Sequence, residues 1–425
     1  MSHKGSPQID SSCIQIFSMV SNELMIDSVL DPEHPHKLRL HTWDGRKTAT
    51  ALITRVCRHT YIPVPIVGAL AAAVRFPTTS RSFGTAAKLT ASIREYSSRY
   101  VRLGKEAIDI LIAFALASYF VDCLPVSPIL CLLGPDSEAA LVLRLLGSIC
   151  RRSILVSDID TAALGTLPNK LDPTLLINQR KLPQRVMRIL QASTDRRFCI
   201  ARGKDQINAY GAKAFAADPE FADGMGMHVT LSPAGDALPT LMDAEEEMLT
   251  NDFQAKLLRY RMVNWRRVRD AQIDLTNFVP AMRDEVRTWL APICDCPDLR
   301  NSVSDFLLQK SRDAEGSRVS DDECVVAEAA LFFCHSEETE CFFVGDLAEQ
   351  VNALLAGRHE DRTLTDKKVG LLLRALGIRG RRVVQGYKIS LTDDIREQIH
   401  RIAVAYQVLS VQDRVTRCSH CAAET

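Results

Sequence analysis

The alternation of apolar and polar positions divides the chain into regions of different plan. Before residue 84, short apolar runs such as Leu38–Trp43 and Ala49–Val56 are separated by turn-like stretches, which predicts a small N-terminal β-rich module. Between residues 129 and 201, short apolar runs alternate with amphipathic segments of helical period. That alternation predicts parallel strands covered by helices on both faces.

The middle region carries the most informative pattern. Ile129–Leu133 is a fully apolar run that ends at Gly134 and Pro135, and an amphipathic segment follows from Glu138 to Cys150. Further apolar runs follow at Ser153–Val156, Thr174–Ile177 and Arg197–Ala201. A long helical stretch at 243–271 then begins with acidic residues and ends with basic ones, as the helix dipole favours.

The last hundred residues predict helix, strand, helix, helix and hairpin, which is the order of a winged helix-turn-helix. Thr363 or Thr365 can cap the third helix, and Gly377 is in position to end it. The expected helices are Asp321–His335, Asp346–Ala356 and a third reaching Leu376, and the expected strands are Cys341–Val344, Arg381–Val384 and Tyr387–Leu391.

These changes of pattern predict a fold of three parts: an α/β core, a small N-terminal β-containing module and a C-terminal winged helix-turn-helix. The predicted segments are the β-rich module at 1–83, a helical lead-in with the core at 84–275, a helical connector at 276–320, the winged-helix domain at 321–410 and a flexible tail at 411–425.

The turn after Ile129–Leu133 is where a phosphate-binding loop would lie. A working loop reads G-x-x-x-x-G-K-[ST], in which backbone amides and the lysine hold phosphates and the hydroxyl binds magnesium. Here the turn begins with Gly134 and Pro135, and Ala139 and Ala140 stand near the lysine and hydroxyl positions. Asp136 and Glu138 add negative charge where a triphosphate would bind. We therefore interpret the segment as a degenerate nucleotide site.

The run Thr174–Ile177 ends in Asn178 and Gln179. A working Walker B strand ends in two carboxylates, one of which holds magnesium while the other orients the attacking water. The amides of Asn178 and Gln179 have nearly the same shape without the charge, so they cannot act as a general base and they bind magnesium weakly.

Several stretches in this order resemble the helicase-like P-loop ATPases that bacterial phages, plasmids and integrated elements carry. The resemblance covers about residues 60–275 and rests on Asp122–Pro128, Leu143–Gly147, Asp172–Ile177, Tyr210–Lys213 and Phe253–Arg261. It implies a P-loop fold and ATP-dependent work on DNA. This chain departs from the family at the chemistry, since the loop lysine, the Walker B acids and an arginine expected in the stretch 223–228 are all missing.

These losses predict a protein that is not an enzyme, with no catalytic residue and no cofactor. The alternative is that Gly134 and Pro135 form an ordinary turn that never held a nucleotide. Both interpretations exclude efficient ATP hydrolysis.

Charge identifies a second candidate site. The 425 residues carry 52 basic and 52 acidic side chains, so the chain as a whole is not basic. The segment 363–388, however, has a net charge of +6, and 313–349 before it has a net charge of −10. The basic side chains are Lys367, Lys368, Arg374, Arg379, Arg381, Arg382 and Lys388. A basic helix and wing predict binding to DNA, and a protein-binding winged helix is the alternative.

Two further features leave their function open. The basic helix end Arg259–Arg269, which includes Tyr260 and Trp265, either contacts single-stranded nucleic acid or covers an apolar helix face with long arginines. Cys418 and Cys421 resemble half of a zinc site without a second pair, so no metal is predicted.

The remaining composition predicts a cytoplasmic protein. The 13 cysteines are scattered without a disulfide framework, the first ten residues lack the apolar stretch of a signal peptide, and Leu111–Val121 is too short to span a membrane. The expected function is that of a catalytically inactive, helicase-like pseudo-ATPase with a DNA-binding winged helix, structural or regulatory in replication or transcription of a mobile element. The alternatives are a weakly active ATP-dependent DNA helicase and a protein-interaction scaffold. DNA is the expected partner, together with a homo-oligomer or a protein partner.

Overall fold

A computed structural model describes residues 13–21, 24–66, 68–168, 170–198, 200–202, 205–207, 209–218, 225–232, 239–319, 322–335, 339–406 and 408. Internal contacts group the chain into two compact units, Met1–Leu308 and Gln309–Thr425. The tail expected at 411–425, with Cys418 and Cys421, lies outside the described residues. Among the helices of the described segments, none is both long enough and apolar enough to cross a bilayer.

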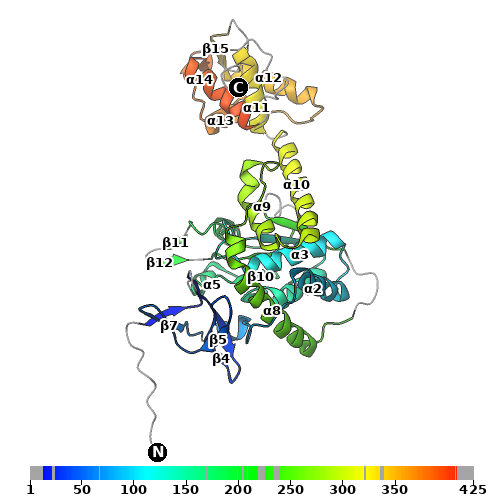
Figure 1. Cartoon of the computed structure of the whole chain (residues 1–425). Coiled ribbons are helices and arrows are strands. Elements are labelled where there is room, and N and C mark those ends of the chain that lie inside the picture. The colour runs from blue at the N-terminus through cyan, green and yellow to red at the C-terminus, as the bar shows by residue number, and fades with distance from the viewer. Residues whose placement is uncertain are drawn as a thin grey trace, which may run out of the picture. The chain divides into compact units, whose positions relative to one another are not determined.

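The first unit begins with short strands in the region where the sequence predicts β structure (Figure 1). In chain order they are β1 (Cys13–Ile16), β2 (Ser18–Val20), β3 (Met25–Asp31), β4 (His34–Trp43), β5 (Thr48–Ala51), β6 (Thr54–Val56) and β7 (His59–Pro63). The strands β2, β3, β4 and β5 pair antiparallel in chain order, and β7 lies between β1 and β6 in a separate sheet. The turn between β4 and β5 is short, as the run Asp44–Lys47 predicts.

A mixed α/β core follows, built on a parallel sheet of five described strands. They are β8 (Ile129–Leu133), β9 (Ser153–Val156), β10 (Thr174–Ile177), β13 (Lys213–Ala217) and β14 (Met227–Thr230). Their spatial order is β14-β8-β13-β10-β9, so β13 separates β8 from β10. Because every pairing is parallel, the carboxyl ends of all these strands meet at one edge of the sheet.

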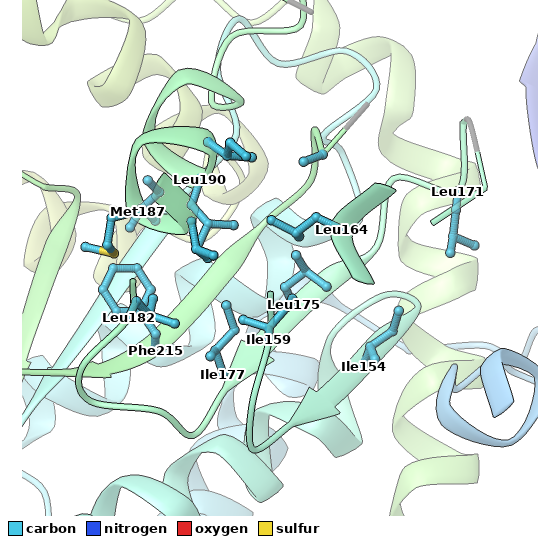
Figure 2. Close-up of a cluster of buried hydrophobic side chains, with 14 of the residues drawn as sticks. Ile154, Ile159, Leu164, Leu171, Leu175, Ile177, Leu182, Met187, Leu190 and Phe215 are labelled. Carbon is cyan, nitrogen blue, oxygen red and sulfur yellow. The ribbon is translucent and has the colours of Figure 1, made fainter. Parts of the chain in front are cut away.

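Helices cover both faces of this sheet, as the alternation of patterns predicts. On one face, α4 (Asp136–Ile149) packs against β9, β10 and β13. On the other face, α5 (Thr161–Thr166) and α6 (Gln184–Ala192) bury leucines and isoleucines against alternate strand positions such as Leu175, Ile177 and Phe215 (Figure 2). The strand period of two assigns neighbouring residues to opposite faces, and therefore each strand contributes to two apolar layers.

Two strands of the sheet differ from the sequence expectation. The run Arg197–Ala201 does not enter the parallel sheet, because Ile200–Arg202 (β11) pairs instead with Asp205–Ile207 (β12) in a small hairpin. The central strand of the sheet is β13, whose sequence is KAFAA and which the apolar pattern did not predict. Alanine has little preference for strands, so burial on both faces rather than propensity determines this strand.

Further helices precede and follow the sheet along the chain (Figure 1). Before the sheet in the chain come α1 (Gly68–Ala73), α2 (Ala86–Tyr100) and α3 (Lys105–Ser118). After it in the chain come α8 (Asp243–Arg269), α9 (Arg283–Leu290) and α10 (Pro297–Val319). Short 3-10 turns, Pro280–Met282 and Ala291–Ile293, precede and follow α9. All eleven residues from Ile108 to Ser118 of α3 are buried, which agrees with a core helix.

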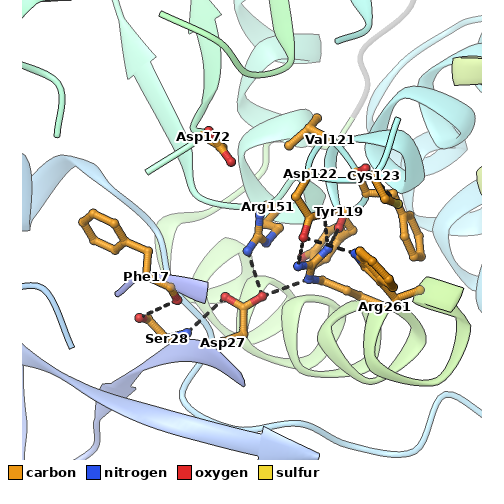
Figure 3. A network of polar contacts seen from close by, with 12 residues as sticks. Phe17, Asp27, Ser28, Tyr119, Val121, Asp122, Cys123, Arg151, Asp172 and Arg261 are labelled. Carbon is orange, nitrogen blue, oxygen red and sulfur yellow. Dashed lines mark hydrogen bonds and ion pairs between the residues drawn. The ribbon is translucent and has the colours of Figure 1, made fainter. Parts of the chain in front are cut away.

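A buried ion network ties β3 to the core and to α8 (Figure 3). Asp27 accepts hydrogen bonds from Arg151 at 2.8 Å, Arg152 at 2.6 Å and Arg261 at 2.9 Å. Arg261 also donates to Asp122. Burial alone would raise the pKa of Asp27, but the three guanidinium groups outweigh it and hold that pKa well below its usual range.

The second unit has its own hydrophobic core, to which Val325, Leu347, Leu373 and Ile389 contribute. Its elements are α11 (Asp322–His335), β15 (Cys341–Phe343), α12 (Val344–Gly357), α13 (Asp366–Ala375), β16 (Arg381–Val383), β17 (Gly386–Ser390) and α14 (Asp393–Ala405). Thr365 caps α13 through its side chain, and Gly377 follows the helix with a φ of +84°. The three strands form one antiparallel sheet in the order β15-β17-β16.

Candidate functional site

The crevice at the carboxyl edge of the parallel sheet is the first candidate site. Strand β8 leads on to β9 at one end of the sheet, whereas its neighbour β13 leads on to β14 at the other end. In open α/β sheets, ligands bind outside the strand ends at such a reversal of direction. Gly134 follows β8, Asn178 follows β10 and Asp218 follows β13, so their positions in the fold bring the predicted nucleotide-site segments to one edge.

The turn after β8 is too short to wrap a phosphate. In the fully described segment 129–149, only Gly134 and Pro135 separate the end of β8 from the start of α4. Gly134 has a φ of +139°, and a Cβ there would lie 2.4 Å from the carbonyl oxygen of Leu231. Close packing against the end of β14 therefore accounts for this glycine without a ligand.

The first turn of α4 is acidic and its alanines face inward. Ala139 is fully buried, and its amide donates to the carbonyl of Pro135 at 3.0 Å, while Ala140 is half-buried. Asp136 and Glu138 occupy the first helical turn, where carboxylates are favoured by the helix dipole. The amide groups that would attract phosphate are thus already surrounded by negative charge.

Asn178 and Gln179 have separate roles at the end of β10. The side-chain oxygen of Gln179 accepts a hydrogen bond from the amide of Ile159 at 3.1 Å, which holds the loop between β9 and α5. The backbone amide of Asn178 continues the sheet by donating to Val156 at 2.8 Å, and its side chain is exposed. Gln179 is therefore engaged in structure, while Asn178 faces solvent at the crevice.

Arg180, the next residue, bridges the crevice. Its guanidinium donates to Asp136 at 2.6 and 2.8 Å, to Asp218 at 3.0 Å and to the carbonyl of Gly134. One side chain therefore joins the residues that follow β8, β10 and β13. We call this arrangement the Arg180 clamp.

Electrostatic attraction stabilises the ion pairs of the Arg180 clamp. Hydrogen bonds to Asp136 and Asp218 raise the pKa of Arg180 above its ordinary value, so the guanidinium stays charged. The side chain of Arg180 is only 26% exposed, whereas that of Asp136 is 80% exposed. The cation at this edge is thus compensated by carboxylates of the chain itself rather than left for a phosphate.

Sequence reasoning missed both Arg180 and Asp218. The available signal was their position, because Arg180 is the third polar residue after the apolar run Thr174–Ile177 and Asp218 directly follows the run 213–217. The stretch 223–228 was expected to resemble an arginine-bearing family segment, but its described residues, 225–228, lie at the edge of the sheet opposite the crevice. Its described part begins β14 at the amino edge of the sheet, and His228 contacts the carbonyl of Met225 there at 2.8 Å.

The second candidate site is the basic surface of the C-terminal unit. Lys367 and Arg374 are exposed on α13, two turns apart on one side of the helix, and Leu371 between them is 54% exposed. Lys368 points elsewhere, because its amine lies 3.7 Å from Asp322 on α11. Arg379 is exposed after the helix.

The hairpin of β16 and β17 divides the remaining predicted cations between its two faces. Arg382 is directly opposite Tyr387, and Arg381 is directly opposite Lys388. Directly opposed residues of antiparallel strands point to the same face, and successive residues alternate. Arg374 lies over the ring of Tyr387, 5.3 Å from its centre, so Arg382 shares the α13 side and Arg381 and Lys388 are on the other side.

A groove of about 900 Å³ runs between α13 and this hairpin. Lys367, Leu371, Arg374 and Tyr387 line it, together with two carboxylates, Asp346 at the start of α12 and Asp366 at the start of α13. The predicted basic residues therefore separate into a groove face, which comprises Lys367, Arg374 and Arg382, and a far face with Arg381 and Lys388.

Comparison with known proteins gives distant likenesses. No family model matches the chain, and no curated protein matches it. Among solved structures, the apo C-terminal region of NrS-1 is 9% identical, covering 86% of this chain and 96% of that one with a TM-score of 0.32. Cdc6p from Pyrobaculum aerophilum is 13% identical, covering 74% and 97% with a TM-score of 0.22. The description of the fold accordingly rests on the chain's own strand order.

Proposed function

We propose that the protein is a catalytically inactive, helicase-like pseudo-ATPase that binds DNA through its C-terminal unit. Its role would be structural or regulatory, in replication or transcription of a mobile element. The setting in a mobile element derives from the sequence resemblance, and the loss of catalysis derives from the crevice. The single observation that carries the proposal is the Arg180 clamp.

The clamp supports inactivity because it uses the space and the charge that ATP would need. Phosphoryl transfer requires a cation on the phosphates, a held magnesium ion and an oriented water. Arg180 is bound to Asp136 and Asp218, the chain has no lysine in the β8–α4 turn, and Gln179 is used to hold a loop. Displacing Arg180 would leave two carboxylates beside a triphosphate, which is unfavourable.

The DNA half of the proposal rests on the groove face. Helix, strand, helix, helix and hairpin is the element order of a winged helix-turn-helix, in which the helix before the hairpin enters the major groove. That helix here is α13, and Lys367, Arg374 and Arg382 share its side of the hairpin. Cations grouped on one face favour phosphate contact over a merely solvated surface.

The nucleotide test uses the purified full chain. We expect no saturable binding of ATP with magnesium by calorimetry, and no hydrolysis above background with or without DNA. The Tm should also be unchanged by ATP. A ligand that bound the folded chain would raise the Tm, since at a hundred times its Kd it would stabilise the fold by about 2.7 kcal/mol. Measurable turnover would instead establish a weakly active ATPase, and saturable binding without turnover would contradict the blocked crevice.

The DNA test compares two double variants of equal charge. Arg374→Gln with Arg382→Gln should weaken duplex binding and lower the salt slope by about 2, since each lost phosphate contact removes about 0.9. Arg381→Gln with Lys388→Gln, on the far face, is the matched control and should keep most of the affinity. Fluorescence anisotropy with a labelled duplex measures both. If the full chain shows no salt-dependent binding, the unit is a protein-interaction module instead.

A further inference from the structure

A cavity of about 450 Å³ in the first unit is lined by four cations and three hydroxyl groups. The lining residues are Arg46, Lys47, Thr48, Ser80, Arg81, Ser82 and Arg259. No acid is among these described lining residues. Guanidinium, ammonium and hydroxyl groups are the donors that proteins use for phosphate oxygens. The composition of the cavity therefore points to a polyanionic ligand.

Bonds of Asp44 and His41 hold the frame of the cavity, while two of its cations have contacts of their own, since Arg81 lies 3.9 Å from Asp252 and Arg259 lies over the Trp43 ring. The β4–β5 turn is fixed because Asp44 Oδ1 accepts from the amides of Arg46 at 2.8 Å and Lys47 at 2.7 Å. The Nε2 atom of His41 contacts Ser80 Oγ at 2.8 Å. The long side chains of Arg46 and Lys47 are exposed to solvent.

Trp43 lies between this cavity and a second one, because it contacts a residue of the first and lines the second. The guanidinium of Arg259, which lines the first cavity, lies 3.6 Å from the centre of the Trp43 ring. Trp43 itself lines a cavity of about 400 Å³ with Trp265 and the apolar side chains of Met25 and Met262. The β4–β5 turn lies between the two, with Asp44 and Gly45 on one and Arg46 and Lys47 on the other.

A third cavity of about 260 Å³ continues along α8. It is lined by Trp265, Arg266 and Arg269, together with Val20 and Ser21 of the N-terminal module. Arg259 and Arg266 are seven residues apart, which is about 10 Å along a helix, or about three stacked nucleotides. Cations and indole rings thus alternate along one path, which we call the Trp43 track.

We infer that the Trp43 track binds single-stranded nucleic acid, with phosphates at the cationic cavities and a base in the cavity between them. This site lies in the first unit and is independent of the proposed C-terminal DNA contact. It takes up the nucleic-acid interpretation of Arg259–Arg269 for the arginines that line the cavities, whereas Tyr260 and Arg261 of that segment are buried and fit the structural interpretation. A base within a duplex is stacked and cannot enter the indole-lined cavity, so single strands are the fitting ligand.

The test measures the affinity of the full chain for labelled oligo(dT) and oligo(U) across salt concentrations. Arg46→Gln with Lys47→Gln should weaken binding several-fold and lower the salt slope by about 1.4, because each phosphate contact to a single strand contributes about 0.7. Both changes leave the backbone bonds of Asp44 intact. Arg185→Gln with Arg188→Gln, an exposed pair on α6, gives the same change of charge and should leave binding unaltered.

Tryptophan fluorescence gives a second measurement. Binding should quench the emission of the wild-type chain, and Trp43→Leu should remove most of the quenching if the variant keeps its circular dichroism spectrum and Tm. Arg81→Gln, at a side chain that is 65% exposed, replaces it if Trp43→Leu fails to fold and should weaken binding in the same direction.

Duplex binding separates this inference from the proposed function. Arg46→Gln with Lys47→Gln should leave duplex affinity unchanged, whereas the Arg374 and Arg382 pair should leave oligo(dT) affinity largely unchanged. Weaker binding of oligo(dT) or oligo(U) by the Arg46 and Lys47 variant than by the wild type supports the track. Equal single-strand affinity of the wild type, the Arg46 and Lys47 variant and the α6 control overturns it, whatever the C-terminal unit does.

Discussion

Lys213 is the most unusual single residue of the core. It begins β13 and has no exposed surface, and its amine donates to the carbonyls of Gly211 at 2.8 Å and Ser193 at 3.3 Å. Burial lowers the pKa of Lys213 to about 7, although Asp172 opposes the shift. A lysine whose amine is held by carbonyl oxygens rather than by a carboxylate is costly to bury in its charged form.

The low pKa of Lys213 predicts a dependence of stability on pH. Between pH 7 and about 10.4, the unfolded chain holds a proton that the folded chain has released, so the free energy of unfolding rises with pH, by at most about 1.4 kcal/mol per pH unit. Below pH 7 the cost of burying the charge is fully present. Lys213→Met should remove this rise and stabilise the protein at pH 7.

Urea unfolding at pH 7, 8 and 9 measures the effect. Lys181→Met is the control, because Lys181 is exposed and is solvated in both states. A wild-type slope equal to that of Lys213→Met would contradict the assignment.

At the scale of elements, local signals were sufficient for several of the helices. The sequence predicts a helix near Glu138–Cys150 and another near 243–271, and the structure has α4 and α8 at these places. Their apolar positions recur at helical spacing and their first turns are acidic, so each carries its own evidence. The hairpin at 381–391 and the Thr365 cap were predictable for the same reason.

The central strand and the crevice depended on information that is not local. The segment KAFAA of β13 has a single strand-favouring residue, Phe215, and only the arrangement of the finished sheet places it between β8 and β10. Asn178 and Gln179 were recognised because they follow an apolar run. Arg180 and Asp218 become partners only through the strand order, since 38 residues separate them in the chain. The Trp43 track is likewise assembled from β4, the β4–β5 turn and α8.

At the scale of the whole molecule, the two units have separate sources of stability. The first unit relies on the layered apolar core and on the Asp27 network, whereas the second has the core around Leu373 and Ile389. Units with separate cores unfold as separate cooperative transitions unless a large interface couples them.

This separation predicts two calorimetric transitions that respond to different variants. Asp27→Asn leaves three buried guanidinium groups without their charged acceptor, so it should lower the free energy of unfolding of the first unit alone, by about 3–5 kcal/mol. Leu373→Ala, at a side chain 1% exposed, should lower the free energy of unfolding of the second unit alone, by about 2–5 kcal/mol. If either variant shifts both transitions equally, the two units unfold together.

The Asp27 network also has a consequence for the order in which the protein can be completed during translation. Asp27 and Arg261 are separated by 234 positions. At about 5–20 residues per second, the ribosome needs roughly 10–50 s to synthesise the intervening chain. Throughout that interval the β-rich module presents a carboxylate and apolar strands without their final covering. Strand β3 is therefore made well before the helix that secures it, which makes holdase chaperones most relevant before α8 emerges.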